Sequence, residues 1–424
     1  MGSMLSDLKN QSKKILANYL YPKYVYIPLA SGGDEDITTF VKKGDYVCIG
    51  TIIGKRKEPN KISIHSSVSG YVVGFVEKYD YHGKKVRCVK IENDGKDTYL
   101  EDLPYQKKIN QYTKKEFLET ILDTGIVGLG GDAIPTYIKY NTDKKLTTLI
   151  VNATECDPYV SSDTVLFMEK CEEILETIDA IVEINHMEEA VIAVSKKNTG
   201  LIHKINNYIG TYLNIRMKLV EDHYPIGWER TLVREICHTN YKEIPMEKGI
   251  VVNNVATIFA IYEALKYHKP LTERIVTFSG EGFQKQYNVK IKIGTLVKDV
   301  VEAMQGYSEE NVVLVAGGAM RGKAIASDEF VLSPEISCVL ALIPTEVKQS
   351  LPCISCGKCI MRCPAKLNPI LIKDAYQKKN KKLLEQLEVE RCMGCGLCSY
   401  ICPTHQNLRE DMIEIKKWWK GGKS

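Results

Sequence analysis

Eight of the fourteen cysteines fall into two copies of one spacing near the end of the chain. Each copy reads Cys-x2-Cys-x2-Cys-x3-Cys-Pro, and the copies occupy residues 353–364 and 392–403. Thiolates are the ligands that soft metal centres prefer. Three evenly stepped cysteines can wrap one face of a compact metal cluster, but the fourth cannot easily reach the same cluster. The pattern therefore predicts a C-terminal part that folds around metal.

The repeated spacing, with a proline after each fourth cysteine, is the ligand run of bacterial ferredoxins that hold two [4Fe–4S] clusters. In that arrangement the fourth cysteine of each run binds the other cluster. We therefore predict two ligand sets: Cys353, Cys356, Cys359 and Cys402 for one cluster, and Cys392, Cys395, Cys398 and Cys363 for the other. All-cysteine zinc sites also use Cys-x2-Cys pairs, so zinc is the alternative.

Composition limits the class of protein. A hydrophobic fraction of 44% and a charged fraction of 26% are ordinary for a soluble globular chain. A net charge of +4 gives no argument for a nucleic-acid partner. No apolar run approaches the roughly 18 residues of a membrane-spanning helix. Unprotected cluster thiolates require a reducing compartment, so we expect a cytoplasmic protein.

The order of sequence patterns predicts a multidomain protein of α/β and α+β domains. Short β-rich runs with glycine turns come first, then apolar strands alternating with helical patterns, such as a helix over residues 165–184. The first part resembles the barrel-sandwich hybrid of lipoyl and biotinyl domains, without their Ala-Met-Lys-Met sequence. We expect four domains, with bounds 22–105 (barrel), 110–265 (α/β), 268–345 (β-rich around one helix) and 350–415 (two clusters).

The α/β part carries four segments that suggest a ligand site. A glycine-rich loop covers residues 125–135, and polar residues 152–158 directly follow a predicted strand. Residues 224–230 and 252–257 complete the set. Glycines let backbone N–H groups approach an anion closely, and open α/β sheets bind ligands at the carboxyl ends of their strands.

Taken in order, these segments resemble the flavin-bearing, NADH-oxidising subunit of respiratory complex I, and more closely its relative in the Rnf complex, the RnfC protein. The resemblance covers nearly the whole chain and implies a flavin- and NADH-binding α/β domain, then a β-grasp ligand-binding domain at 268–345, then the two-cluster domain. It implies that FMN contacts Gly128, Gly130, Gly131, Lys139, Asn152, Glu155, Asn253, Asn254 and Thr257. Glu229 corresponds to a carboxylate at the nicotinamide and flavin site, and is the candidate catalytic residue.

The glycine loop departs from the family pattern. The family usually continues Gly-Gly-Ala-Gly-Phe-Pro, whereas this chain has Asp132, Ala133 and Ile134 after its two glycines. A carboxylate about 4 Å from a phosphate costs about 1 to 4 kcal/mol, depending on the local dielectric. The alternative to a flavin site is therefore an inherited fold whose pocket no longer binds flavin.

The resemblance leaves three functional hypotheses. The first is an NADH-dependent oxidoreductase subunit that passes electrons between NADH and ferredoxin-type acceptors, peripheral on the inner face of the cell membrane with Rnf-type membrane subunits as partners. The second is a soluble RnfC-like reductase that feeds a cytosolic acceptor enzyme, as cobalamin reductase or the proline-reductase partner does. The third is a ferredoxin-like carrier without flavin.

The chain ends with paired tryptophans among lysines, Trp418 and Trp419. Tryptophan prefers interfaces between polar and apolar surroundings, and lysines favour anionic lipid heads. Two interpretations remain open: a last helix that packs on the cluster domain, or a contact with a membrane partner.

Overall fold

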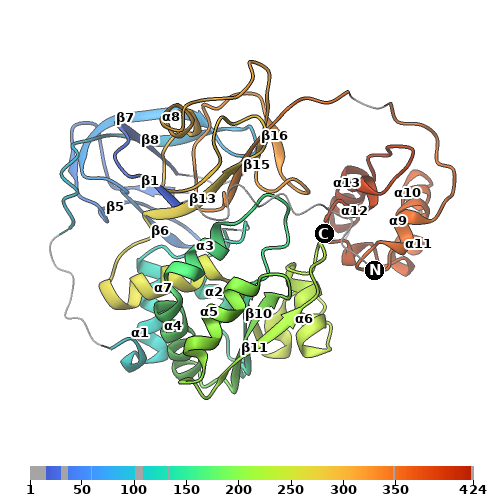
Figure 1. Cartoon of the computed structure of the whole chain (residues 1–424), viewed down its shortest axis with the longest axis horizontal. Coiled ribbons are helices and arrows are strands. Elements are labelled where there is room, and N and C mark those ends of the chain that lie inside the picture. The colour runs from blue at the N-terminus through green and yellow to red at the C-terminus, as the bar shows by residue number, and fades with distance from the viewer. Residues whose placement is uncertain are drawn as a thin grey trace. The chain divides into compact units, whose positions relative to one another are not determined.

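The computed structural model describes residues 16–29, 37–58, 60–100, 108–131, 133–346 and 349–421 (Figure 1). The chain divides into two compact units. Unit 1 comprises Met1–Gly318 and Lys323–Ile343, and unit 2 comprises Ala319–Gly322 and Pro344–Ser424. No helix among the described residues combines the length and the apolar character needed to cross a membrane.

The first part of unit 1 is built from two small antiparallel sheets that enclose one apolar core. Short runs of β-branched residues separated by glycine turns favour such strands over helices. The first sheet has the order β2-β8-β7-β4, with bounds Tyr24–Pro28, Lys85–Asn93, Gly70–Tyr79 and Tyr46–Val47. The second has the order β3-β5-β6, with bounds Ile37–Thr39, Ile52–Arg56 and Ile62–His65.

The second part of unit 1 is a parallel sheet with helices on both faces. Its order is β11-β10-β9-β12, with bounds Ile215–Val220, Glu189–Ser195, Thr148–Ala153 and Ile250–Asn254. All three strand pairs are parallel, so all four carboxyl ends lie at one edge. The strands are nearly continuous apolar runs because both of their faces are buried.

Alternate residues of these strands enter two different cores. One core packs Leu149 and Val151 against four helices: α1 (Lys114–Asp123), α4 (Cys171–Ile184), α5 (Thr199–Ile209) and α7 (Val255–Tyr267). The other core packs Ile150 against α6 (Glu229–Cys237). The remaining helical segments here are η1 (Ile109–Gln111), α2 (Tyr137–Tyr140), α3 (Ser162–Glu169) and η2 (Pro245–Lys248).

The single helix predicted over residues 165–184 is two helices in the structure. Helix α3 ends before Lys170, whose backbone leaves the helical region at φ −118° and ψ 38°, and α4 begins at Cys171. Apolar periodicity continues through the break because both helices bury residues in the same core. Periodicity reports burial and does not report a change in helix direction.

The third part of unit 1 is a six-stranded mixed sheet beside one helix, α8 (Val297–Ala303). Its order is β1-β14-β13-β17-β15-β16, with bounds Leu16–Tyr19, Tyr287–Lys292, Glu273–Ser279, Cys338–Leu342, Val313–Ala316 and Lys323–Ile325. The first strand of the chain lies parallel to β14, in register from Leu16 with Asn288 to Tyr19 with Ile291. This sheet therefore joins the N-terminal segment to residues far along the sequence.

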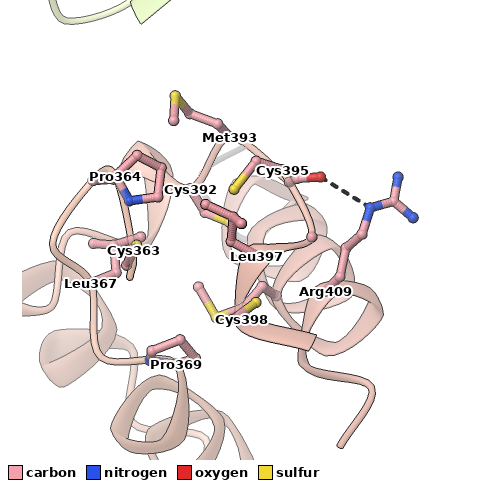
Figure 2. A pocket seen from close by; sticks show the side chains of 14 residues that line it. Cys363, Pro364, Leu367, Pro369, Cys392, Met393, Cys395, Leu397, Cys398 and Arg409 are labelled. Carbon is pink, nitrogen blue, oxygen red and sulfur yellow. Dashed lines mark hydrogen bonds between the residues drawn. The ribbon is translucent and has the colours of Figure 1, made fainter. Parts of the chain in front are cut away.

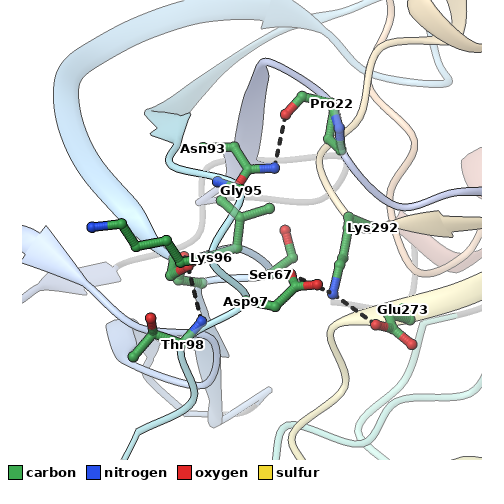
Figure 3. A network of polar contacts seen from close by, with 12 residues as sticks. Pro22, Ser67, Asn93, Gly95, Lys96, Asp97, Thr98, Glu273 and Lys292 are labelled. Carbon is green, nitrogen blue, oxygen red and sulfur yellow. Dashed lines mark hydrogen bonds and ion pairs between the residues drawn. The ribbon is translucent and has the colours of Figure 1, made fainter.

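A buried ion network links this sheet to the barrel (Figure 3). The Lys292 side chain is only 2% exposed, and its Nζ lies 2.8 Å from Glu273 Oε1 and 3.8 Å from Asp97 Oδ1. Burial alone would raise the pKa of Glu273, but the charges of Lys269, Lys292 and Lys290 outweigh it and hold that pKa well below its usual range. Because the ions are desolvated, each depends on its partners.

We predict that Glu273→Gln lowers the free energy of unfolding by about 3 to 5 kcal/mol, because it leaves Lys292 charged, buried and without its closest counter-ion. Chemical denaturation followed by circular dichroism measures the loss. Glu77→Gln is the control: Glu77 pairs with Lys85 at 3.9 Å with both side chains more than half exposed, and such pairs contribute about 0 to 1 kcal/mol. Equal losses in the two variants would contradict the prediction.

Unit 2 is a helical domain with the two cysteine runs at its helix ends. Its elements are α9 (Lys358–Met361), α10 (Pro369–Gln377), α11 (Lys381–Gln386), η3 (Val389–Arg391), α12 (Leu397–Tyr400) and α13 (Leu408–Gly421). Asn368 and Asn380 accept backbone N–H groups at the starts of α10 and α11. A small core containing Ile372, Leu384 and Ile415 holds the helices together.

The terminal helix packs within unit 2. Trp419 is only 8% exposed and belongs to the core of this unit. The ring of Trp418 meets that of Tyr376 edge to face at 5.3 Å between centroids, and Lys381 Nζ lies 5.3 Å from the Trp418 ring centre. Of the two interpretations of this segment, the structure supports the packed helix.

Candidate flavin site and cluster sites

The candidate flavin site is built at the carboxyl edge of the parallel sheet. Strands β9 and β12 are neighbours, and Asn254 pairs in register with Asn152 at their last residues. The glycine loop lies beside this edge, because a Cβ placed on Gly130 would stand 3.6 Å from the side chain of Asn254. Segments more than a hundred residues apart in sequence thus meet where open α/β sheets bind ligands.

The glycine loop is a closed turn that is tied to helix α7. The Gly128 N–H donates to the Ile134 carbonyl at 2.8 Å, and the Ala133 N–H donates to the Gly128 carbonyl at 3.1 Å. Gly131 has φ 107°, a conformation that side-chain-bearing residues rarely adopt. The Leu129 N–H donates to the Thr257 hydroxyl at 2.9 Å. Asp132 lies outside the described residues.

Asn254 connects the loop to two helices. Its Oδ1 caps α7 by accepting the Thr257 N–H at 3.2 Å, and it also accepts the Thr257 hydroxyl. Its Nδ2 donates to Asp163 Oδ2 at 3.0 Å. A single amide therefore fixes the start of α7, the start of α3 and, through Thr257, the glycine loop.

Glu155 and Asp163 form a pair of carboxylates at the start of α3. The Glu155 oxygens accept the backbone N–H groups of Asp163 at 2.8 Å and Thr164 at 3.1 Å. Burial, and then the charge of Glu155, raise the pKa of Asp163 to about 7. Asp163 therefore holds a proton up to near-neutral pH, at a place where the sequence pattern gave no signal for a functional residue.

Asn152 holds the third segment of the site against the sheet. Its Nδ2 donates to the Gly227 carbonyl at 2.7 Å, and its Oδ1 accepts the Thr154 hydroxyl at 2.8 Å. A Cβ on Gly227 would lie 2.4 Å from Thr154 Oγ1, so only glycine fits there. The Gly227 N–H also donates to Cys156 Sγ at 3.3 Å. This contact brings the segment before α6 to the end of β9.

Three predicted residues have other partners. Lys139 Nζ donates to the Val252 carbonyl at 2.9 Å. Asn253, 3% exposed, donates to the hydroxyl of the fully buried Tyr140. Glu229 begins α6, and its Oε1 accepts the Tyr241 hydroxyl at 2.9 Å. The ammonium of a lysine has three donors, so Lys139 can bind both this carbonyl and an anion.

The residues present fit a flavin mononucleotide. The closed glycine loop offers backbone N–H groups without side chains in the way, and Lys139 follows it on α2. Amide groups of Asn152 and Asn254 stand at the adjacent strand ends. Donors of this kind suit a phosphate and the polar edge of a flavin ring.

The second predicted cluster set shares one hollow in unit 2 (Figure 2). Cys363, Cys392, Cys395 and Cys398 all lie on its wall, together with Pro364 and Leu367. Burial raises the pKa of Cys395 to about 11 and that of Cys398 to about 12, and the charge of Cys363 contributes to both shifts. The fourth cysteine of the first run is therefore next to the first three cysteines of the second run.

Helix α13 braces this hollow from one side. Arg409 Nε donates to the Gly394 carbonyl at 3.0 Å, as drawn in Figure 2. Lys416 Nζ donates to the Cys392 carbonyl. Two cations from the terminal helix thus hold the loop that carries three of the four thiols, and they bring positive charge to a centre that thiolates make negative.

The first predicted set is more open. Cys353 and Cys356 are exposed, while Cys359 is buried. Burial raises the pKa of Cys359, and the charges of Cys353 and Cys356 add to the shift. The Leu351 N–H donates to the Thr404 carbonyl at 3.0 Å, which places the turn after Cys402 beside the start of the first run. Both fourth cysteines therefore lie near the opposite run.

The spacing of the thiols favours clusters over single ions. Within the described ranges, no three His, Cys, Asp or Glu side chains stand close enough together to share one metal ion. A cubane cluster presents a different iron to each of its four thiolates, so its ligands stand farther apart than those of one zinc ion. The hollow walled by four cysteines fits the cluster and does not fit the zinc alternative.

Comparisons with known proteins agree with this architecture. Residues 2–96 match the RnfC barrel sandwich hybrid domain, residues 121–263 match the Nuo51 FMN-binding domain, and residues 346–403 match a 4Fe-4S dicluster domain. The fold and the sites thus define a flavin- and iron–sulfur-dependent electron-transfer protein. The predicted barrel, the complex-I-type flavin domain and the two-cluster domain are confirmed at this level.

Relatives identify the family. The chain is 30% identical over 391 residues to the RnfC-type component of the proton-translocating ferredoxin:NAD(+) oxidoreductase complex of Clostridium ljungdahlii, covering 88% of this chain and 85% of the relative. It is 30% identical over 368 residues to the corresponding component of the Na(+)-translocating complex of Acetobacterium woodii, covering 85% and 82%. The chain belongs to the RnfC family.

A solved structure supports the fold alone. The NAD+-reducing [NiFe]-hydrogenase in its H2-reduced state superposes with a TM-score of 0.52 at 16% identity. The superposition covers 73% of this chain and 63% of the hydrogenase chain.

We predict that Thr257→Val weakens FMN binding about tenfold, measured by quenching of FMN fluorescence. The change removes the hydroxyl that accepts the Leu129 N–H, and an unsatisfied buried donor costs about 1 to 3 kcal/mol. Thr257→Ser keeps the hydroxyl and is the control, expected to bind within about twofold of wild type. Equal affinity for the Val and Ser variants would show that the hydroxyl does not anchor the loop.

We predict that Cys363 and Cys395 serve one cluster and that Cys363 and Cys356 serve different clusters. Cys395→Ala and Cys363→Ala/Cys395→Ala should each retain about four iron atoms per chain, whereas Cys363→Ala/Cys356→Ala should retain almost none. Iron content and EPR of anaerobically reconstituted protein measure this. The opposite pattern would mean that each cysteine run binds its own cluster.

Proposed function

We infer that this chain is the electron-transfer subunit that passes electrons between NADH and ferredoxin-type acceptors. The observation that carries the inference is the pairing, in one chain, of a glycine loop at the carboxyl edge of a parallel sheet with two four-cysteine sets that take up residues from both runs. The first site suits a flavin, and the second suits centres that carry one electron each.

Each part of the chain has a distinct task in this reaction. Bound FMN would supply the exchange between the two electrons of a hydride and the single electrons of the clusters. We propose that Gly128, Gly130 and Gly131 present backbone N–H groups to the flavin phosphate and that Lys139 adds a charge. Asn253, which is anchored on Tyr140, would fix the end of β12 beside the flavin.

We propose that Asn152, Glu155, Asn254 and Thr257 orient the flavin ring edge. Asn254 and Thr257 hold the glycine loop against α7 through the Leu129 N–H, so their geometry sets how closely the loop approaches the ring. Glu155 keeps α3 and the Asp163 carboxyl in place. Because Asp163 carries a proton up to near-neutral pH, it can donate a hydrogen bond at this edge without adding charge.

Glu229 is the proposed carboxylate on the nicotinamide side. It stands at the first residue of α6, and Tyr241 donates a hydrogen bond to it. The segment before it is held against β9 by the Asn152–Gly227 bond. The chain's own groups therefore position the carboxylate relative to the sheet edge, where a hydride donor would lie beside the flavin.

The wider assignment follows from the family. Relatives of this chain are subunits of ion-translocating oxidoreductase complexes. We propose that this chain likewise works as a peripheral subunit on the inner, cytoplasmic face of the membrane, with Rnf-type membrane subunits as partners and NADH as the hydride donor. We further propose that the six-stranded sheet with α8, within residues 268–345, is a β-grasp domain.

The proposal is tested by the cofactor content of the anaerobically purified and reconstituted protein. We expect about one FMN, released on denaturation, and about eight iron atoms per chain. Cofactor extraction and the visible spectrum report both. A chain that binds its iron but no flavin in excess FMN would be a ferredoxin-like carrier, and the proposed function would be wrong.

A further inference from the structure

The two cysteine runs differ sharply in exposure. Every residue from 351 to 356 is exposed, including Cys353 and Cys356. In the second run, Cys395 is buried, and Cys392 and Cys398 are half-buried in the hollow of Figure 2. One cluster site of unit 2 is therefore enclosed by protein, while the other reaches the surface of the unit.

Large apolar side chains surround the exposed run. Ile354 is 65% exposed and Met361 is 73% exposed. Helices α9 and α12 pack against each other, so the exposed Ile360 and Tyr400 belong to neighbouring elements. Single exposed apolar residues are ordinary, but several on adjacent short elements mark an interaction surface.

The charge of this region has one sign. Residues 349–371 and 392–408 contain Lys358, Arg362 and Lys366 and no Asp or Glu. These three cations are exposed, and among the described residues none of them forms an ion pair. On the adjacent helices, by contrast, Lys373 and Lys378 are paired with carboxylates at 2.6 Å and 2.8 Å.

We propose that an acidic one-electron carrier protein docks on this surface, hereafter the port surface: Leu351, Ile354, Lys358, Ile360, Met361, Arg362, Lys366 and Tyr400. The proposal rests on the proposed function and adds where electrons leave or enter unit 2. An apolar centre with cationic side chains complements a partner whose own apolar centre is rimmed by carboxylates. One electron passes in each encounter, the carrier changes by one electron, and no covalent bond forms or breaks.

The choice of a protein carrier over a lipid surface comes from the layout of the port surface. The apolar side chains and cations are distributed over two short helices and a loop that also carries the ligands Cys353 and Cys356. A carrier must bring its redox centre close to those ligands and then dissociate, which charge steering allows without tight binding. A membrane surface would receive no electron there.

The test uses the full reconstituted chain and an acidic bacterial two-cluster ferredoxin as the probe. Binding is measured anaerobically by calorimetry at low salt and again at about 0.5 M salt, where surface charges are screened. We expect Lys358→Glu/Arg362→Glu to weaken binding about tenfold or more at low salt, with most of the difference lost at high salt. Met361→Gln, which keeps the charge, should weaken binding at both salt concentrations.

Lys379→Glu/Lys382→Glu is the matched control. It makes the same change in net charge in the same unit, but its exposed lysines lie on the α10–α11 hairpin, outside both cysteine runs. We expect this control to bind within about twofold of wild type. Iron content and EPR of each variant exclude loss of a cluster as the cause.

Several outcomes would overturn the proposal. Equal weakening by both double variants would reduce the effect to overall charge. Wild-type protein that is reduced by NADH yet shows no affinity for the ferredoxin would refute the port surface and leave the proposed function standing. Binding of anionic vesicles that is lost in Lys358→Glu/Arg362→Glu, without ferredoxin binding, would assign the surface to lipid. Failure of NADH to reduce FMN-loaded wild type would refute the proposed function instead.

Discussion

The candidate flavin site depends on the pairing of β9 with β12, which brings Asn152 and Asn254 to one edge of the sheet. Asn254 then makes every connection that turns this edge into a site: it caps α7, receives the Thr257 hydroxyl and binds Asp163 at the start of α3. The glycine loop is fixed through the same group by the Leu129 N–H. Loss of this amide would release three segments that are distant in sequence.

Unit 2 follows a comparable logic, with thiols in place of amides. Cys363 closes the hollow of the second run, and the Leu351–Thr404 bond holds the turn after Cys402 beside the first run. Each run thus needs the other to complete its ligand set, and α13 braces the result through Arg409 and Lys416. Metal binding in such an arrangement contributes directly to the stability of the fold.

Ligand chemistry was predictable from the sequence, whereas contacts made by folding were not. Cysteine spacing indicated the two cluster sets because the geometry of a cluster dictates the spacing, and glycine and asparagine segments indicated the flavin site through family resemblance. Nothing local marked Asp163, whose role comes from burial beside Glu155. Lys292 has the sequence context of a surface strand residue, yet it is buried against Glu273. The pairing of Leu16–Tyr19 with β14 joins opposite ends of unit 1, which no periodicity can reveal.

The central claim is that one chain accepts a hydride at the sheet edge and hands on single electrons through its cysteine-bound clusters. An anaerobic NADH titration of the reconstituted protein, followed by EPR and visible absorbance, tests it most directly. The account predicts that FMN-loaded protein develops reduced-cluster signals as NADH is added, and that the same protein stripped of FMN does not. Cluster reduction by NADH that is equally fast without FMN, or no reduction with FMN bound, would contradict the account.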